Sequence, residues 1–254
     1  MNLKDKVAVV TGASSGIGYE IARALAERKA SVILTARRGN LLEEHAKDFR
    51  EKYKADVRAI VSDLSNESSI DKLVKQTQEL YSGVDILVNA AGQFIVAKEP
   101  LLLRDPRINL NDFNQVMEVN FYGPARLIFK LLPYMKKNCM VVNISSDADR
   151  KVYSGQPGYH ASKAALSHLT RALAAENSGI SFYALSPGNV NTEMLRRTIE
   201  GNPEIKQAIR REMDLDEFYG KILQPSDISK KVLELIEKRP RLDDPVILMP
   251  SYEF

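Results

Sequence analysis

A glycine-rich turn near the amino terminus joins an apolar segment to an amphipathic one, and it constrains the fold more than any other feature. Residues 7–10 are continuously apolar and rich in β-branched side chains, which predicts a strand covered on both faces. The turn reads Thr-Gly-Ala-Ser-Ser-Gly-Ile-Gly at residues 11–18, and apolar residues then recur at helical spacing. Glycines in this setting allow a tight turn and let a pyrophosphate approach the helix N-terminus. We therefore expect a phosphate-binding turn, the alternative being an ordinary flexible loop.

Strand and helix patterns alternate along the rest of the chain. Further strands are predicted at residues 31–35, 56–61, 84–88, 140–144, 180–185 and 246–248. Helices are predicted at 41–53, from Ser65 or Asn66, at 111–136, at about 159–177 and at 225–238. This alternation predicts right-handed crossovers and a parallel sheet. The predicted fold class is α/β: a single doubly wound Rossmann-type domain over residues 1–254, with about seven parallel strands and helices on both faces.

Composition narrows the class of protein. The chain is 44% apolar and 27% charged, and its net charge of +3 is not gathered into a long basic block, so we expect a soluble globular protein that binds no nucleic acid. No run of about 18 apolar residues could span a bilayer, and the amino terminus lacks the apolar core of a signal peptide. The lone cysteine, Cys139, excludes an internal disulfide, and the three histidines form no ligand cluster. A cytoplasmic protein with no metal site and no membrane contact is predicted.

Tyr159 and Lys163 stand four residues apart in a predicted helix, which places them on one face, one turn apart. A nearby ammonium favours the phenolate, so we expect Lys163 to lower the Tyr159 pKa from its free value near ~10. The phenol would then serve as a proton donor and acceptor. The same spacing also arises by chance on surface helices. His160 is expected to face elsewhere, because successive helical residues point about 100° apart.

These motifs occur in the order typical of one enzyme family. The turn has the spacing Gly-x-x-x-Gly-x-Gly, and Ser146 precedes Tyr159 by thirteen residues. From residue 6 to about residue 247, the chain resembles the classical branch of the short-chain dehydrogenase/reductase (SDR) family. The resemblance implies a catalytic tetrad of Asn120, Ser146, Tyr159 and Lys163. Ser145 is a rival for Ser146, but the thirteen-residue interval favours the latter.

The resemblance also implies a nicotinamide dinucleotide cofactor. The turn would contact its diphosphate and ribose, Asp63 its adenine ring, and the segment after the sixth strand its carboxamide. Residues 89–92 read Asn-Ala-Ala-Gly where the family has Asn-Asn-Ala-Gly, a mild departure. The residues expected at the cofactor are Gly12, Ser14, Ser15, Gly16, Ile17, Gly18, Arg37, Arg38, Asp63, Leu64, Asn89, Ala90, Gly92, Tyr159, Lys163, Pro187, Gly188, Val190 and Thr192.

The charges after the second strand predict which dinucleotide binds. Sites for NAD commonly place Asp or Glu about 20 residues after the glycines, on the ribose 2′-hydroxyl. This chain instead has Arg37 and Arg38, with no carboxylate between that strand and Glu43. A guanidinium can bind a 2′-phosphate bidentately, whereas a carboxylate would repel it. We therefore predict NADP(H) in preference to NAD(H), with Arg37 as the main contact and Arg38 or Ser14 assisting; two solvated arginines are the alternative.

The family's chemistry gives each member of the tetrad an expected role. Tyr159 would give or take the proton at the substrate oxygen, and Ser146 would hydrogen-bond the same oxygen. Lys163 would also bind the nicotinamide ribose, and Asn120 would help hold a water that links Lys163 to solvent. The predicted function is an NADP(H)-dependent oxidoreductase acting on small carbonyl or secondary alcohol substrates, with 3-oxoacyl thioesters, ketosteroids, sugars and xenobiotics all open. The alternatives are a non-catalytic NADP(H)-sensing or structural protein, and an epimerase or dehydratase.

Regions outside these motifs carry further expectations. The connection between Gly92 and Asn120 is longer than is usual in the family and includes residues 101–106, and residues 147–151 are charged where the family often has a small apolar stretch. Both would lie near the substrate mouth, either as contacts for a polar substrate or as a solvated rim. Residues 192–223 correspond to the family's substrate lid. Its apolar residues either line a pocket or pack onto the body: Met194, Leu195, Ile199, Met213, Leu215, Phe218 and Tyr219.

The family's assembly gives a last expectation. Its members are usually tetramers or dimers, so the resemblance implies a homo-oligomer. The helices from Asn111 and from about Ser154 would form one interface, and the final strand would form another.

Overall fold

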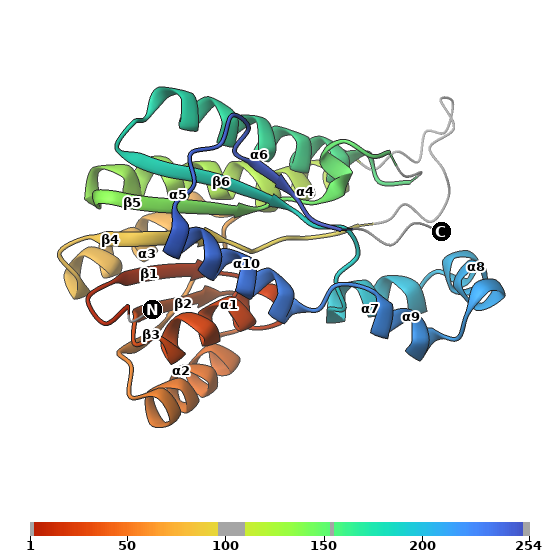
Figure 1. Cartoon of the computed structure of the whole chain (residues 1–254), viewed down its shortest axis with the longest axis horizontal. Helices are drawn as coiled ribbons and strands as arrows, with labels where there is room; N and C mark the ends of the chain where they lie inside the picture. Colours follow the sequence, from red (N-terminus) through yellow and green to blue (C-terminus); the bar gives the residue numbers. More distant parts are fainter. Residues whose placement is uncertain (1–2, 96–109, 153–154, 251–254) are drawn as a thin grey trace.

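The strands form one parallel sheet in a computed structural model that describes residues 3–95, 110–152 and 155–250. They are β1 (Val7–Thr11), β2 (Ser31–Ala36), β3 (Val57–Val61), β4 (Val84–Asn89), β5 (Met135–Ile144), β6 (Ile180–Ser186) and β7 (Val246–Leu248). Their order across the seven-stranded sheet is β3-β2-β1-β4-β5-β6-β7, and every neighbouring pair is parallel. The predicted doubly wound α/β arrangement is confirmed (Figure 1).

Helices cover both faces of this sheet (Figure 1). One face carries α1 (Gly16–Glu27), α2 (Gly39–Tyr53) and α10 (Pro225–Lys238), and the other carries α3 (Glu67–Leu80), α5 (Gly123–Leu131) and α6 (Pro157–Glu176). Ile21 and Phe49 belong to the buried cluster on the first face, and Ile70 and Leu127 to the cluster on the second. Each such side chain contributes about 1.5–3 kcal/mol when it is fully buried. The two apolar layers therefore hold the strand ends, and the site built on them, in fixed positions.

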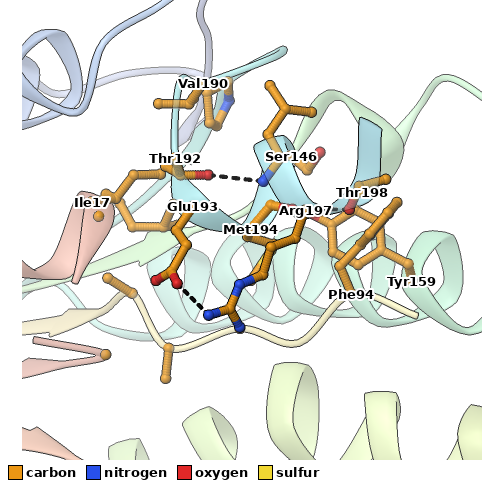
Figure 2. A pocket seen from close by; sticks show the side chains of 18 of the residues that line it. Ile17, Phe94, Ser146, Tyr159, Val190, Thr192, Glu193, Met194, Arg197 and Thr198 are labelled. Carbon is orange, nitrogen blue, oxygen red and sulfur yellow. Dashed lines mark hydrogen bonds and ion pairs between the residues drawn. The ribbon is translucent and has the colours of Figure 1, made fainter. Parts of the chain in front are cut away.

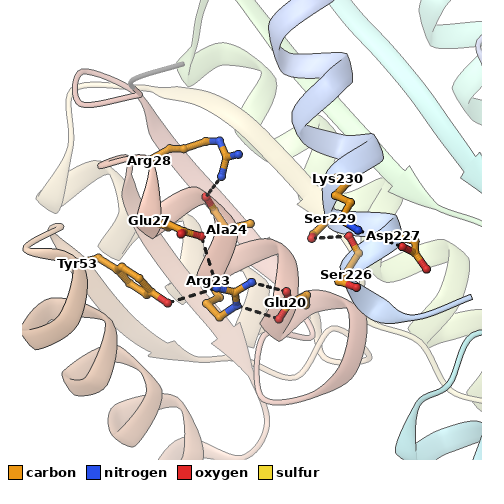
Figure 3. Close-up of polar contacts among 10 residues, drawn as sticks. All are labelled: Glu20, Arg23, Ala24, Glu27, Arg28, Tyr53, Ser226, Asp227, Ser229 and Lys230. Carbon is orange, nitrogen blue, oxygen red and sulfur yellow. Dashed lines mark hydrogen bonds and ion pairs between the residues drawn. The ribbon is translucent and has the colours of Figure 1, made fainter.

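Polar contacts join α1 to α2 at the surface. Arg23 donates to the two carboxylate oxygens of Glu20, at 2.5 and 2.9 Å, and to the Tyr53 hydroxyl at 3.3 Å (Figure 3). Partly exposed ion pairs of this kind contribute about 0–1 kcal/mol each. The buried clusters, and not these contacts, account for most of the packing energy between the helices and the sheet.

The predicted helix at residues 111–136 is wrong in its extent. The chain forms α4 (Leu110–Met117), a π-helical turn (Glu118–Tyr122), α5 and a 3₁₀ turn (Leu132–Tyr134), and β5 already begins at Met135. Pro133 has no backbone N–H with which to continue a helix. Met135 then pairs with Val84 of β4. Pairing within the sheet therefore replaces the last helical turns that the sequence pattern predicts.

The carboxyl ends of β1 and β4 lie side by side at the point where the strand order reverses. Ligands of open α/β sheets bind at this point. Three short helices lie beyond the same edge (Figure 1): α7 (Glu193–Glu200), α8 (Pro203–Glu212) and α9 (Leu215–Lys221). Their own apolar cluster centres on Ile199, Ile209 and Phe218, each 1% exposed. The segment predicted to be a lid thus has a small core separate from the two clusters on the sheet.

Some expectations concern residues that lie outside the described ranges. These are the connection at residues 101–106 and the start of an interface helix at residue 154. Within residues 3–95, 110–152 and 155–250, no helix is both long enough and apolar enough to cross a bilayer.

Candidate active site

A cleft of about 1890 Å³ runs along the carboxyl edge of the sheet, between the strand ends and the lid helices. The glycine-rich turn, the ends of β2 to β6 and the first residues of α6 and α7 contribute to its wall. Among the residues predicted from the sequence, Asn89 and Asn120 are not part of that wall. The other predicted residues do line it: Gly12, Ser14, Ser15, Gly16, Ile17, Gly18, Arg37, Arg38, Asp63, Leu64, Ala90, Gly92, Ser146, Tyr159, Lys163, Pro187, Gly188, Val190 and Thr192.

The backbone of the glycine-rich turn approaches β4 too closely for any side chain at Gly12. Gly12 has a φ of +68°, and a Cβ there would lie 2.8 Å from the carbonyl oxygen of Ala90 and from the nitrogen of Ala91. The Thr11 hydroxyl accepts hydrogen bonds from the N–H groups of Ala90 and Ala91, both at 3.0 Å. The sequence motif includes Thr11 but assigns it no role. In the structure it fastens the turn to the end of β4.

The N-terminus of α1 opens onto the cleft. Ser15 is its N-cap residue but makes no capping hydrogen bond with its side chain. The Ser15 hydroxyl instead accepts from the Arg38 guanidinium at 2.5 Å. A Cβ on Gly18 would lie 2.5 Å from the carbonyl oxygen of Gly12, so only glycine lets the helix start this close to the turn. The first-turn amides and the positive end of the helix dipole therefore face a space where an anion can bind.

Arg38 lies directly against the glycine-rich turn. Its Nε and Nη2 atoms donate to the Ser14 hydroxyl at 3.1 and 2.9 Å. Its Nη1 atom is 3.9 Å from a carboxylate oxygen of Glu193 on the lid. Arg37 also lines the cleft and is exposed. Of the two predicted arginines, Arg38 is the one whose guanidinium is held beside Ser14.

Asn89 and Asp63 take part in contacts that shape the cleft. The Asn89 side chain donates to the Asn143 amide oxygen at 2.8 Å, and Asn143 donates to the Thr170 hydroxyl at 2.9 Å. This buried chain links β4, β5 and α6, so Asn89 positions the residues that follow it, which do line the cleft. The Asp63 carboxylate accepts from the Ser65 N–H and hydroxyl at 3.0 and 2.8 Å.

Tyr159 and Lys163 project from the first turns of α6 into the cleft, as the four-residue spacing predicts. The Lys163 ammonium is 5.7 Å from the centre of the Tyr159 ring and donates to the carbonyl oxygen of Ile144 at 2.8 Å. Phe94 packs edge-on against the Tyr159 ring, with ring centres 4.7 Å apart (Figure 2). Nothing in the sequence pattern singles out Phe94, because it is brought to Tyr159 only by the path of the chain after β4.

Ser146 follows β5 and is the N-cap of a 3₁₀ turn (Asp147–Asp149). Its hydroxyl accepts from the Ala148 N–H at 3.2 Å and donates to the Asp147 carboxylate at 3.3 Å. The Ser145 hydroxyl instead bonds to the Ser167 hydroxyl at 2.7 Å, beneath α6. Both serines line the cleft, but the Ser146 hydroxyl bonds to Asp147 and Ala148 of its wall, whereas the Ser145 hydroxyl is directed to Ser167 and to the backbone of Lys163.

Asn120 lies in the π-helical turn, a distortion that often marks functional sites. Its side-chain oxygen accepts from the Gln93 N–H at 2.7 Å, and its nitrogen donates to the Gln93 carbonyl at 2.9 Å and to the Ser162 hydroxyl at 3.1 Å. A Cβ placed on Gly92 would lie 3.7 Å from the Asn120 side-chain oxygen and 3.9 Å from the Lys163 nitrogen. Asn120 and Lys163 therefore both approach Gly92, with Asn120 behind the cleft wall.

Burial dominates the protonation of the central pair. It raises the pKa of Tyr159 to about 12, while a hydrogen bond with Ser146 lowers it and the Asp147 charge raises it further. Burial lowers the pKa of Lys163 to about 8, and the Asp149 carboxylate acts in the opposite direction. The Tyr159 pKa thus departs upward, contrary to the lowering expected from Lys163. The sequence shows that the two residues share a helix face, but it does not show how deeply they are buried.

Most apolar residues of the lid segment pack against one another, and some of them also line the cleft. Ile199, Phe218 and Tyr219 are buried in the lid's own cluster, and Leu195, Met213 and Leu215 pack against that cluster. Met194 is 42% exposed and lines the cleft; Figure 2 shows it with Arg197 and Thr198 of α7 among the residues of the same pocket as Tyr159 and Phe94. Ile199 and Phe218 also contribute to the cleft wall, so the lid cluster borders the cleft.

In the part of the chain that the structure describes, no group of three His, Cys, Asp or Glu side chains could hold a metal ion. The buried Cys139 thiol has a pKa raised to about 11 by burial, as expected of a structural cysteine.

Comparison with known proteins gives matches over most of the chain. A model of the short chain dehydrogenase family matches residues 6–203. A fatty acyl-CoA reductase of Acinetobacter baylyi is 32% identical over 242 residues, which cover 94% of this chain and 76% of that protein. An alcohol dehydrogenase from the archaeon Thermococcus sibiricus, complexed with 5-hydroxy-NADP, superposes with a TM-score of 0.81 at 27% identity, covering 97% of this chain and 99% of that one. A variant of actinorhodin polyketide ketoreductase with NADPH gives 0.83 at 28% identity, covering 98% and 97%.

Proposed function

The chain belongs to the short chain dehydrogenase family, and on that premise we propose that it is an NADP(H)-dependent oxidoreductase acting on carbonyl and secondary alcohol substrates. One observation carries the proposal. Ser146, Tyr159 and Lys163 line the same cleft as the glycine-rich turn and the N-terminus of α1. A phosphate site and a proton-transfer group thus share one cavity.

The residues present fit a dinucleotide. Gly12 and Gly18 pack without side chains against the end of β4 and the turn itself, which brings the turn backbone and the first amides of α1 to the cleft, where a diphosphate could approach them. Asp63 and Leu64 would border the adenine, and Pro187, Gly188, Val190 and Thr192 the nicotinamide end. When bound, NADPH would supply the hydride.

The charges beside the expected position of the adenosine ribose 2′-phosphate favour NADP(H). Arg38 is held against Ser14 and Ser15 by hydrogen bonds, and Arg37 follows β2 at the same corner of the cleft. Two guanidinium groups and two hydroxyls offer a phosphate several charge-assisted hydrogen bonds. Two of the similar solved structures are complexes with 5-hydroxy-NADP and with NADPH.

The side chains of the cleft would handle the proton and the developing negative charge. Tyr159 would donate its phenolic proton to the substrate oxygen during reduction and accept it during oxidation. Ser146 would donate a hydrogen bond to that oxygen as its charge develops. The Lys163 ammonium would favour the phenolate that remains. Asn120 would hold Gln93 and Ser162 in place behind Lys163.

Apolar residues of the cleft wall suggest a substrate with an apolar body. Phe94 packs against the Tyr159 ring, and Met194, Leu195 and Ile205 contribute to the wall from the lid. Apolar side chains of this kind select alkyl and aryl groups by burying them, at about 25 cal/mol per Å². The relative from Acinetobacter baylyi is named for a fatty acyl substrate. We therefore place alkyl ketones, alkyl aldehydes and acyl thioesters ahead of sugars.

A panel assay tests the proposal. Purified protein is mixed with NADPH and with aldehydes, 2-ketones and 3-oxoacyl thioesters of increasing chain length, and the loss of NADPH absorbance is followed. We expect turnover whose kcat/KM rises with chain length, and a parallel panel with NADH that is at least tenfold slower. A silent panel in the presence of tight NADPH binding would favour a nucleotide-sensing protein instead.

Exposed aromatic side chains support assembly into a homo-oligomer. Tyr122, Phe129 and Tyr134 are 44%, 53% and 44% exposed and lie on the segment expected to form an interface. Light scattering of the purified protein distinguishes a monomer from a dimer or tetramer.

A further inference from the structure

The carboxylate of Asp149 lies next to the hydroxyl groups of three buried serines. Ser167 donates to its Oδ2 atom at 2.6 Å and Ser186 to its Oδ1 atom at 3.2 Å. The Ser145 hydroxyl lies 3.5 Å from Oδ2 and donates to the Ser167 hydroxyl at 2.7 Å, because the single Ser167 proton is bonded to Asp149. The serines are 1%, 0% and 3% exposed, respectively. Hydrogen bonds to an ionised acceptor are about twice as strong as neutral ones. The carboxylate therefore fixes the direction of the Ser167 and Ser186 hydroxyls directly, and that of the Ser145 hydroxyl through Ser167.

Each serine adjoins a residue of the proposed active site. Ser145 immediately precedes Ser146 at the end of β5, and Ser186 immediately precedes Pro187 at the end of β6. Ser167 lies on α6, one turn after Lys163. The Ser145 hydroxyl also contacts the Ser167 hydroxyl at 2.7 Å and the carbonyl oxygen of Lys163 at 3.2 Å. Asp149 thus connects the three elements that carry the reacting groups.

The same carboxylate is an electrostatic neighbour of Lys163. Lys163 is 5% exposed, and burial lowers its pKa to about 8, while Asp149 acts to raise it. The other charged and titratable groups nearby are Asp147 and Tyr159 on the cleft side, and Arg171 further along α6, which is paired with Asp244 at 3.0 Å. His160 faces the carbonyl oxygen of Ala148 through its Nδ1 atom at 2.9 Å.

We propose that Asp149 is a positioning residue for the reaction: through the three serine hydroxyls it fixes Ser146, Pro187 and Lys163 relative to one another. An electrostatic consequence follows, since its negative charge acts against the effect of burial on the Lys163 ammonium. The inference rests on the proposed function for its kinetic consequences, but its electrostatic part concerns the folded protein alone. Residues 147–151, singled out in the sequence as unusual for the family, thereby gain a role behind the site and not only at the substrate mouth.

Asp149→Asn is the informative change, because it keeps the shape of the side chain and removes its charge. The titration of Lys163 is followed by amine-specific labelling across pH, read by mass spectrometry, which requires no turnover. Loss of an attractive charge lowers the pKa of an ammonium, so the midpoint for Lys163 should move to lower pH by on the order of one unit. The alkaline limb of the kcat profile should move in the same direction, because protonated Lys163 is the active form. Binding of NADPH below that limb should change less than twofold.

Two further variants separate the two parts of the role. Ser167→Ala removes a hydrogen bond to Asp149 and keeps the charge, so kcat should fall several-fold while the Lys163 midpoint stays in place. Asp244→Asn removes a surface carboxylate from Arg171 without touching the serines, so neither the midpoint nor kcat should change. Melting curves confirm that each variant is folded; if Asp149→Asn is not, the Ser167→Ala result decides the positioning role.

The outcomes are distinguishable. A wild-type protein without turnover, but with a Lys163 midpoint that moves in Asp149→Asn, would sink the proposed function and leave the electrostatic role of Asp149 standing. The inference would be overturned if the wild-type protein turns over substrate and both variants, Asp149→Asn and Ser167→Ala, have the same kcat and the same Lys163 titration midpoint as wild type.

Discussion

Replacing Gly12 by alanine should destabilise the protein because two independent features of that position exclude a side chain. Gly12 has a φ of +68°, and a Cβ there would lie 2.8 Å from backbone atoms of Ala90 and Ala91. The left-handed conformation costs an L-residue about 1–2 kcal/mol. Relieving the contact by moving β4 backbone costs about 1–3 kcal/mol, as other overpacked substitutions do. The sum of about 2–5 kcal/mol corresponds to a Tm lower by roughly 4–20 °C in a domain of this size.

The assay pairs thermal unfolding of Gly12→Ala with that of Gly179→Ala. Gly179 is exposed, and a Cβ there would meet nothing within 4 Å, so alanine should change its Tm by no more than about 2 °C in either direction. NADPH titrations of the same two variants should show weaker binding only for Gly12→Ala, because the shift of β4 distorts the turn. A Gly12→Ala protein that melts within a degree of wild type would refute the reasoning about close approach.

Arg38→Ala should weaken NADPH binding about 10–100-fold and leave NADH binding unchanged. Arg58→Ala, on the edge strand β3, should alter the binding of neither cofactor. Calorimetric titration measures both affinities, and equal losses for NADPH and NADH would contradict the role of Arg38 at the 2′-phosphate. Burial lowers the Lys163 pKa to about 8 from 10.5, so between these values the unfolded state binds more protons and stability rises with pH. Urea unfolding at about pH 7 should therefore find Lys163→Met more stable than wild type, by on the order of 1–3 kcal/mol, with the gap closing by about pH 10; a less stable variant at pH 7 would oppose this. Phe218→Ala removes a large side chain of the lid cluster that is only 1% exposed, and it should raise the substrate KM several-fold in steady-state kinetics with little change in NADPH affinity. An unchanged KM would show that the lid cluster does not shape the cleft.

The periodic part of the fold is predictable from the sequence because each element is locally consistent. Short runs rich in β-branched and other apolar residues mark β1, β2 and β4, which are covered by helices on both faces. Of the two residues expected to begin α3, Asn66 is the cap, its side-chain oxygen accepting from the Ser69 N–H at 3.0 Å. Where a non-local contact decides, the prediction fails: Met135 pairs with Val84 and ends a helix that the pattern extends to residue 136.

The candidate site also contains residues that the sequence identifies and residues that only the folded structure reveals. Tyr159 and Lys163 can be paired from the helical spacing, whereas Ser146 is identified by the thirteen-residue interval that the family resemblance supplies. Phe94 and Asp149 are not identifiable in this way, since each reaches the site through contacts across the fold. The upward shift of the Tyr159 pKa is likewise a consequence of burial, and burial is a property of the packed molecule.

The most direct test of the proposed oxidoreductase is NADPH consumption by wild type and by Tyr159→Phe on the same panel of alkyl carbonyls. The substitution removes the proton-donating hydroxyl and keeps the ring that packs against Phe94. We predict that wild type consumes NADPH, that Tyr159→Phe is slower by at least a thousandfold, consistent with loss of a general acid, and that both bind NADPH with similar affinity. Turnover by Tyr159→Phe near the wild-type rate would contradict the account.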